Sequence, residues 1–207
     1  MARRGWHGIV AEYAQLLGGL SMRDRRGREL GPDAGLVLWR KLTVALRRKK
    51  GTIYLIGNGA SASMASHVAA DLAKNARIHT EVFSDLSLIT AISNDMGYEN
   101  VFAEPLRRRS RPGDMLVAIS SSGRSPNVLS ATDLAASRHL TIVTLSAMEP
   151  GNPLRSMGDL NAYVAAPTYG KAESCHATIL HSWMDLVVID GAGRASTHLG
   201  QPQAERS

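Results

Sequence analysis

Residues 51–74 read GTIYLIGNGASASMASHVAADLAK, and they contain the alternation of elements that decides the fold. The run TIYLIG is short, apolar and partly β-branched, which is typical of a strand buried on both faces. A turn of glycine and asparagine follows it, and helical spacing then continues from Ser61 to Lys74. The stretch therefore predicts one strand–turn–helix unit of an α/β protein.

The same alternation continues toward the C-terminus. Four further apolar runs, HTEVFS, DMLVAIS, LTIVTLS and NAYVAAP, predict four more strands. Helical patterns cover residues 126–137 and about 171–190. Because short apolar strands separated by helices favour a parallel sheet that is covered on both faces, we expect a three-layer α/β sandwich.

Two helices are expected before this region, and a tail after it. Apolar residues recur at helical spacing from Trp6 to Leu20 and from Asp33 to Arg48. The polar, glycine-bearing SMRDRRGRELGP between them predicts a mobile surface connection. Residues 191–207 are small and polar without periodicity, which predicts a disordered tail. We therefore divide the chain into two N-terminal helices (1–50), one domain (51–190) and the tail.

The composition is typical of a single globular domain in a reducing compartment. The 207 residues are 44% hydrophobic and 20% charged, and no apolar run approaches the ~20 residues of a membrane span. Glu12 and Gln15 interrupt the first apolar stretch, which favours a helix over a signal peptide. The single cysteine, Cys175, excludes an intrachain disulfide. We expect a cytoplasmic protein that does not cross a membrane.

The formal charge of +6 comes largely from three basic clusters, at residues 23–28, 47–50 and 107–111. Their positions suggest a loop and two helix C-termini, where cations oppose the helix dipole. No aromatic residues alternate with these cations, as single-strand nucleic-acid binding would favour. The clusters are therefore interpreted as solvated surface, and nucleic acid is not expected as a partner.

Two loops that follow strands have the chemistry of an anion site. In the first, Gly57-Asn58-Gly59 leads into a helix that begins near Ser61. In the second, residues 118–131 read AISSSGRSPNVLSA, and serines stand at 120, 121, 122 and 125. Serine hydroxyls and free N–H groups at a helix N-terminus bind phosphate without lysine, and the carboxyl ends of parallel strands share one edge. The first loop lacks the third glycine of the dinucleotide fingerprint, so no nucleotide cofactor is expected.

Two helices carry further ionisable residues. His67 and Asp71 are four residues apart, on one helix face, where they could bind a divalent metal, exchange protons or simply pair with each other. The last helix, KAESCHATILHSWMDL, contains Glu173, His176 and His181. We interpret His176 as a satisfied polar group, and the neighbouring Cys175 as a thiol in the core.

Three segments together resemble the SIS (sugar isomerase) family and, within it, the phosphoheptose isomerases. GNGASASMASHVAADL resembles the first loop and helix of those enzymes, TAISNDMGYENVFAEPL the segment that follows, and GDMLVAISSSGRSPNV the phosphosugar signature. The resemblance covers about Gly51 to Asp190, with two helices before it. It implies a flavodoxin-like five-stranded parallel sheet and a homo-oligomer, usually a tetramer, with active sites between subunits.

The resemblance also implies roles for individual residues. Ser61, Ser120, Ser122 and Ser125 are expected to hold the phosphate of a sugar phosphate. Asn58 and Asp95 are expected near the sugar. We include Gly59, Ser121, Asn94 and Glu173 in the predicted substrate site.

For catalysis and metal binding, the resemblance points to the two helices. His67 and Asp71 stand where the family has histidine and a catalytic glutamate, and His181 matches a catalytic or metal-binding histidine. Glu173 replaces a glutamine. These four residues form the predicted zinc site, although Glu173 and His181 lie ~12 Å apart along one helix, so one of them would come from a neighbouring subunit.

The predicted function is that of an aldose–ketose isomerase. It would convert sedoheptulose 7-phosphate to D-glycero-D-manno-heptose 7-phosphate, or a close phosphosugar equivalent, through an enediol intermediate, with Asp71 and His181 exchanging the protons. The alternative is a non-catalytic SIS protein that binds a phosphosugar or a protein partner, as the replication-initiator-associating relatives do. A sugar-phosphate-sensing transcription regulator would need a DNA-binding domain, and no helix-turn-helix precedes the SIS region.

Overall fold

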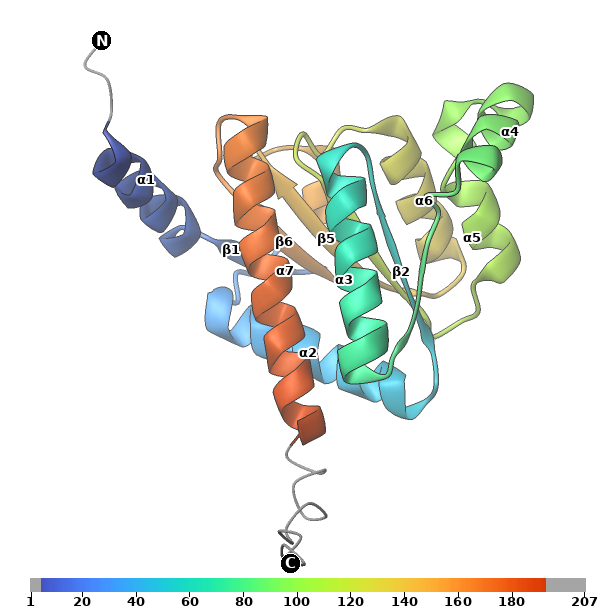
Figure 1. Ribbon diagram of the computed structural model, residues 1–207, viewed down its shortest axis with the longest axis horizontal. Coiled ribbons are helices and arrows are strands. Elements are labelled where there is room, and N and C mark those ends of the chain that lie inside the picture. Colours follow the sequence, from blue (N-terminus) through green and yellow to red (C-terminus); the bar gives the residue numbers. More distant parts are fainter. Residues whose placement is uncertain (1–4, 193–207) are drawn as a thin grey trace, which may run out of the picture.

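A computed structural model describes residues 5–192, and its centre is a six-stranded sheet (Figure 1). The strands are β1 Ser21–Asp24, β2 Thr52–Gly57, β3 His79–Val82, β4 Met115–Ser120, β5 Thr141–Ala147 and β6 Leu160–Val164. Their order is β1-β6-β5-β4-β2-β3, and all neighbours pair in parallel except β1 with β6. The predicted five parallel strands are thus confirmed, in flavodoxin-like order.

The sixth strand, β1, corrects the prediction for the segment between the first two helices. This segment is not a mobile connection, because residues Ser21–Asp24 pair antiparallel with β6. The Glu29 carboxylate accepts hydrogen bonds from the Met22 N–H and the Ser21 hydroxyl. The Met22 side chain is fully buried under α2. One buried apolar residue and one carboxylate therefore hold an otherwise polar strand at the sheet edge.

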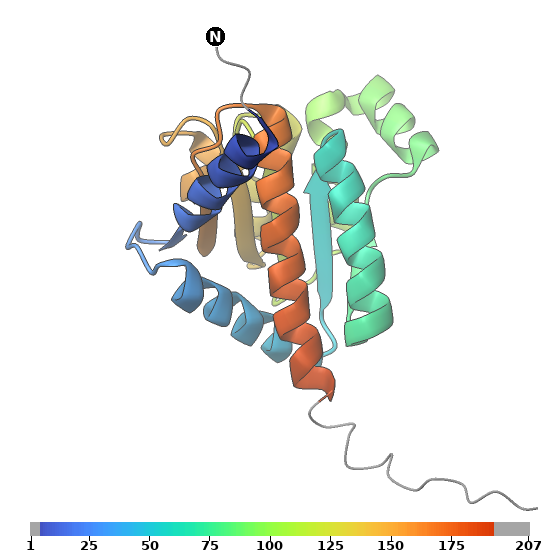
Figure 2. The same ribbon diagram turned by 60° about the vertical axis from the view of Figure 1, so that its left-hand side comes forward.

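Helices form a layer on each face of the sheet (Figure 2). They are α1 Trp6–Gly18, α2 Pro32–Arg48, α3 Ala60–Ala76, α4 Leu86–Met96, α5 Ala103–Arg109, α6 Pro126–Ser137 and α7 Tyr169–Ala192, with short 3-10 helices at Tyr98–Asn100 and Pro153–Ser156. One core joins α2, α3 and α7 to the sheet, and the other joins α4, α5 and α6 to its opposite face. The predicted three-layer sandwich is confirmed.

The sequence analysis gave no bounds for α4 and expected only a helix end near residues 107–111 for α5, and it placed the end of the last helix slightly early. Residues 191 and 192 continue α7, whereas the rest of the predicted tail, residues 193–207, lies outside the described residues. Among the helices of residues 5–192, none has the length and apolar character to span a bilayer.

Alternating residues of the strands supply the two cores. In β2, Ile53 and Leu55 belong to one core, and Tyr54 and Ile56 belong to the other. This alternation follows from the two-residue period of a strand, and all four side chains are buried because both faces are covered.

A pair of tryptophans joins α2 to α7. The rings of Trp39 and Trp183 stack with centroids 4.1 Å apart, and the Trp183 Nε1–H donates to the Thr43 hydroxyl. Both indoles are fully buried. Because α7 also packs on α3, this pair positions one of the two helices that border the candidate site.

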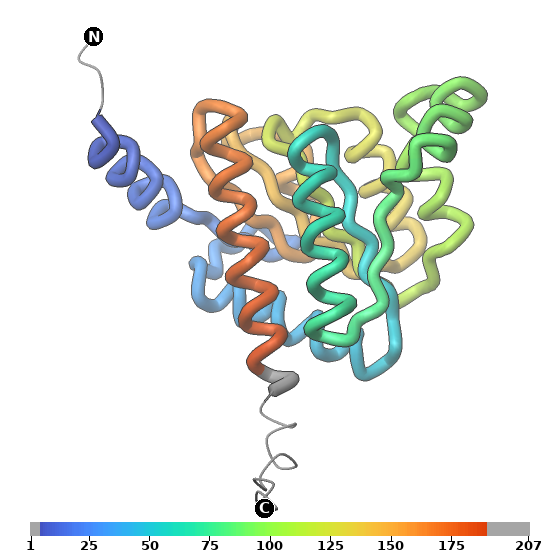
Figure 3. The backbone as a smooth tube through the Cα atoms, in the orientation of Figure 1, coloured from blue at the N-terminus to red at the C-terminus, as the bar shows by residue number. Residues whose placement is uncertain are grey.

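Helix α1 lies at the periphery, beside the N-terminal half of α7 (Figure 3). The Lys171 ammonium pairs with the Glu12 carboxylate, and the Tyr13 hydroxyl donates to Ser174. Trp6 remains 72% exposed. α1 thus packs on its own chain, and the expected packing between subunits stays a prediction.

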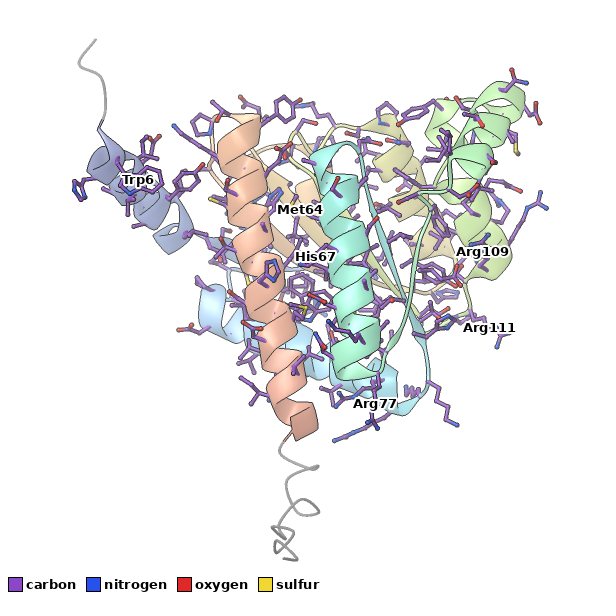
Figure 4. The ribbon with its side chains drawn as sticks, viewed as in Figure 1. Trp6, Met64, His67, Arg77, Arg109 and Arg111 are labelled. Atoms are coloured by element: carbon purple, nitrogen blue, oxygen red, sulfur yellow. The ribbon has the colours of Figure 1, made fainter. Side chains whose placement is uncertain are left out.

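Two of the basic clusters lie at helix C-termini as predicted, at the ends of α2 and α5. The first cluster instead spans β1 and the turn after it. Figure 4 shows Arg77, Arg109 and Arg111 well away from His67 on α3. Arg109 and Arg111, at and after the end of α5, therefore lie away from His67, whereas Lys74 in the last turn of α3 pairs with Asp71.

Replacing Trp183 by alanine tests the role of the tryptophan pair. We expect Trp183→Ala to lower the free energy of unfolding by about 3–5 kcal/mol, because it leaves a large cavity and removes the hydrogen bond that the Thr43 hydroxyl accepts. Urea unfolding of the purified protein measures this. The control, Trp6→Ala, removes an exposed indole and should change stability by less than about 0.5 kcal/mol; equal effects of the two variants would contradict the account.

Candidate active site

The first loop of the site depends on a close approach between β2 and α3. Strand β2 ends at Gly57, and α3 begins three residues later at Ala60. A Cβ atom on Gly57 would lie 2.6 Å from the Ser61 Cβ, which no side chain permits. Glycine at this position therefore allows the N-terminus of α3, with Ser61, to lie directly against the end of the strand.

The second loop connects Ser120, the last residue of β4, to Pro126, the first residue of α6. Gly123 has a φ of 62°, and a Cβ there would lie 1.9 Å from the Asn152 Oδ1. The Ala147 N–H donates to the Ser121 carbonyl, and the Leu154 N–H donates to the Gly123 carbonyl. The serine loop is thus held by the segment that follows β5, so its shape is set before any ligand binds.

The two loops and the start of α7 enclose a cavity of about 160 Å³. It lies at the carboxyl edge of the sheet, where ligands of open α/β sheets bind. Its lining consists of Asn58, Ser61, Ile119, Ser120, Ser121, Ser122, Ser125, Tyr169 and Glu173. The structure therefore brings together most of the substrate-binding residues that the sequence predicted.

Hydroxyl groups dominate the chemistry of this serine cavity. The Ser120 and Ser125 hydroxyls lie 3.1 Å apart, and the Arg124 N–H donates to the Ser122 hydroxyl. The Ser121 hydroxyl is buried and has no hydrogen-bond partner among residues 5–192. Such hydroxyls can donate to an anionic ligand at the N-terminus of α6, whose dipole favours negative charge.

Asn58 is fixed by two residues that the sequence analysis did not single out. Its side-chain amide exchanges two hydrogen bonds with Asn127, at 2.8 and 3.0 Å, and the Tyr98 hydroxyl donates to the Asn58 Oδ1. Asn127 is buried in the first turn of α6, next to the serine loop. The position of Asn127 directly after the Ser-Pro dipeptide is the sequence feature that could have pointed to it. No sequence feature pointed to Tyr169, at the start of α7, which also lines the cavity.

Three predicted substrate-binding residues lie outside the serine cavity. Gly59 lines a neighbouring, mainly apolar cavity of about 280 Å³, together with Phe83 and Tyr98. Asp95 lines a third cavity between α4 and α5, and Asn94 donates to the Asp95 carboxylate. Within one chain, the structure does not bring Asn94 and Asp95 to the serines.

The predicted catalytic residues form a separate group on the exposed surface where α3 and α7 lie side by side, midway along α3 where Figure 4 labels His67. The rings of His67 and His181 have centroids 5.3 Å apart. The Asp71 carboxylate lies 3.5 Å from the His67 Nε2 and 3.7 Å from the Lys74 ammonium. Because Asp71 follows Ser61 by ten residues, it lies ~15 Å further along α3.

Comparison with known proteins identifies this architecture. Residues 40–147 match the SIS domain family. The chain belongs to the SIS domain family. The phosphoheptose isomerase of Shewanella sp. strain ANA-3 is 36% identical over 141 residues, which cover 64% of this chain and 72% of the relative.

Solved structures of phosphoheptose isomerases have the same fold as this chain. The phosphoheptose isomerase of Neisseria gonorrhoeae superposes with a TM-score of 0.70 at 30% identity, covering 74% of this chain and 85% of that one. The phosphoheptose isomerase of Francisella tularensis gives a TM-score of 0.68 at 25% identity, covering 74% and 84%. The resemblance to the phosphoheptose isomerase type is confirmed, and because these relatives are enzymes, so is the prediction that this SIS protein is an enzyme.

The predicted zinc ligands do not form a metal site within one chain of this SIS protein. Glu173 lines the serine cavity, whereas His181 lies eight residues further along α7, beside His67. In the part of the chain that the structure describes, no group of three or more His, Cys, Asp or Glu side chains is arranged to hold a metal ion. The residues present therefore do not fit zinc in a single subunit, and we derive no catalytic step through it.

His176 lies one turn after Glu173 on α7 and points into the core. Its Nε2–H donates to the Ser146 carbonyl at the end of β5, whereas its Nδ1 is buried without a partner among the described residues. Complete burial lowers the pKa of His176 to about 4. The interpretation as a satisfied polar group holds for one ring nitrogen. Cys175 beside it is buried, and burial raises the pKa of its thiol, which confirms a core role.

The buried imidazole predicts an acid-sensitive fold. The His176 pKa falls from 6.5 to about 4 on folding, so between these values the unfolded chain binds a proton that the folded chain does not. This contribution to stability is complete above pH 6.5 and is lost as the pH falls toward 4, by about 3 kcal/mol at 1.36 kcal/mol per unit.

Urea unfolding from pH 7 to pH 4 measures this contribution. The stability gap between the wild type and His176→Gln should narrow by about 3 kcal/mol as the pH falls. His7→Gln, an exposed histidine on α1, serves as the control and should follow the wild type. Parallel pH curves for the wild type and His176→Gln would contradict the account.

Proposed function

We propose that this SIS protein is a phosphosugar isomerase that converts sedoheptulose 7-phosphate to D-glycero-D-manno-heptose 7-phosphate or a close equivalent. The observation that carries the proposal is the serine cavity at the carboxyl edge of the sheet, with Asn58 beside it. Phosphoheptose isomerases that are similar to this chain in sequence and structure support the same substrate class.

In this proposal the serine loop holds the phosphate. Ser120, Ser122 and Ser125 supply hydroxyl donors around the N-terminus of α6, where negative charge is stabilised. The loop needs little reorganisation, because backbone hydrogen bonds already tie it to the segment after β5. A fixed phosphate places the far end of the sugar chain, with C1 and C2, at a defined distance from the loop.

Isomerisation moves a proton between C1 and C2 through an enediol, so ionisable groups must reach these carbons. We retain Asp71 and His181 as proposed proton-transfer residues. In a single chain they lie on the α3–α7 face, away from the serine cavity, so this role requires a neighbouring subunit to bring them to it. The proposal therefore includes a homo-oligomer, a tetramer by family resemblance, that acts in the cytoplasm.

The proposed reaction is tested by incubating the purified protein with sedoheptulose 7-phosphate, with added zinc and with a chelator, and following aldose phosphate by NMR. We expect turnover in at least one condition. Binding without turnover in every condition would contradict the isomerase, and would favour the alternative of a phosphosugar-binding or protein-binding SIS protein.

Serine variants test whether the cavity holds the phosphate. Ser125→Ala removes a hydroxyl of the cavity and should raise KM about tenfold or more, as loss of a hydrogen bond to a charged group predicts. Ser137→Ala is the matched control, since that hydroxyl bonds the Leu134 carbonyl at the other end of α6. Equal KM values for the two variants would place the phosphate elsewhere.

A further inference from the structure

The basic cluster at residues 23–28, which the proposed reaction does not use, borders a cavity of about 200 Å³. Arg23 and Arg25 line this cavity from β1 and the turn after it. Asn152 and Arg155 line it from the segment that follows β5. Three arginines from distant parts of the chain therefore meet in one arginine pocket.

Arg155 is held in this pocket by contacts that do not neutralise its charge. Its guanidinium lies 3.8 Å from the centroid of the Tyr163 ring, and it donates to the Pro150 carbonyl and the Ser21 hydroxyl. Among residues 5–192, no carboxylate forms an ion pair with it, and its Nε is buried without a hydrogen-bond partner. Burial, and then the Arg23 cation, lower the pKa of Arg155, but a guanidinium stays charged at neutral pH. Arg155 is thus a fixed cation that can still receive an anion.

The acidic residues around the pocket are occupied by donors of the chain itself. Asp24 accepts hydrogen bonds from the backbone of the turn after β1 and from the Arg28 side chain. Glu29 accepts from β1, and Asp159 accepts from the backbone of β5 and pairs with Arg25. Five arginines, four at residues 23–28 and one at 155, stand against these three carboxylates, so the region keeps a positive charge.

A phosphate group matches the chemistry of the arginine pocket, because guanidinium groups bind phosphate through paired, charge-assisted hydrogen bonds. The pocket is also at least as large as the serine cavity, at about 200 Å³ against about 160 Å³. We infer that the arginine pocket is an effector site, which binds a second phosphate-bearing small molecule and acts on the serine loop.

Asn152 connects the arginine pocket to the serine loop. Its Oδ1 accepts a hydrogen bond from the Arg155 N–H, and a Cβ on Gly123 would lie 1.9 Å from the same oxygen. The Leu154 N–H donates to the Gly123 carbonyl. A ligand that bridges Arg155 to the arginines of the β1 turn therefore stabilises the segment against which the serine loop packs. This effector role rests on the proposed function, whereas the binding of phosphate in the pocket does not.

Calorimetric titration with pyrophosphate at constant ionic strength tests the site. We expect saturable binding that Arg155→Gln weakens about tenfold or more, as loss of hydrogen bonds to a charged group predicts. Arg25→Gln changes an exposed side chain and should weaken the same site without disturbing the core. Arg111→Gln, an exposed arginine after α5, is the matched control and should bind as the wild type.

Ser125→Ala separates the two sites, because it affects only pyrophosphate that binds in the serine cavity. It should leave the arginine-dependent binding unchanged. Binding that is absent, or that is equal in Arg155→Gln, Arg25→Gln and Arg111→Gln, would overturn the inference. Binding in the pocket by a protein that does not turn over sedoheptulose 7-phosphate would contradict the proposed isomerase and not the pocket.

Hydrogen exchange followed by mass spectrometry tests the effect on the serine loop. In the Ser125→Ala protein, pyrophosphate should slow amide exchange within residues 118–131 about threefold or more, because it stabilises the segment that holds the loop. The double variant Ser125→Ala/Arg155→Gln should show no such slowing. Pyrophosphate binding that leaves exchange in residues 118–131 unchanged would overturn the effector role.

Discussion

The parallel pairing of β2 with β4 is the constraint on which the site depends. Their register places Gly57 opposite Ile119, so the loops that follow the two strands emerge side by side at one edge. Each loop then enters a helix within a few residues, and glycine makes both turns sterically possible, at Gly57 and at Gly123. A cavity lined with hydroxyls is the consequence, and the start of α7 closes it with Glu173.

Most of the fold could be predicted because strands buried on both faces leave a clear apolar signal. The parallel strands β2, β4, β5 and β6 have it, whereas the edge strand β3 has no buried residue. The helices that cover the sheet have regular spacing. β1 could not be predicted in this way, since only Met22 of its four residues is buried and the carboxylate that satisfies its backbone comes from Glu29, outside the strand. In α4 only Ile92 is buried, and α5 has only seven residues, so residues 86–109 show the helical period less clearly.

The site was predictable to the extent that it follows from sequence order. The serines of one loop remain neighbours in space, and Asn58 and Ser61 follow a strand whose partner could be anticipated. Spacing along a helix, however, fixes only separation along that helix. It could not show that Glu173 belongs to the serine cavity while His181, on the same helix, faces His67. Nor could it show that Asp95 points to a cavity between α4 and α5.

The central claim is that the serine loop holds the phosphate of the sugar. A crystal structure of the protein with sedoheptulose 7-phosphate would test it most directly. The account predicts phosphate oxygens within about 3 Å of the Ser120, Ser122 and Ser125 hydroxyls. A phosphate bound elsewhere, for instance in the apolar cavity lined by Gly59 and Phe83, would contradict it.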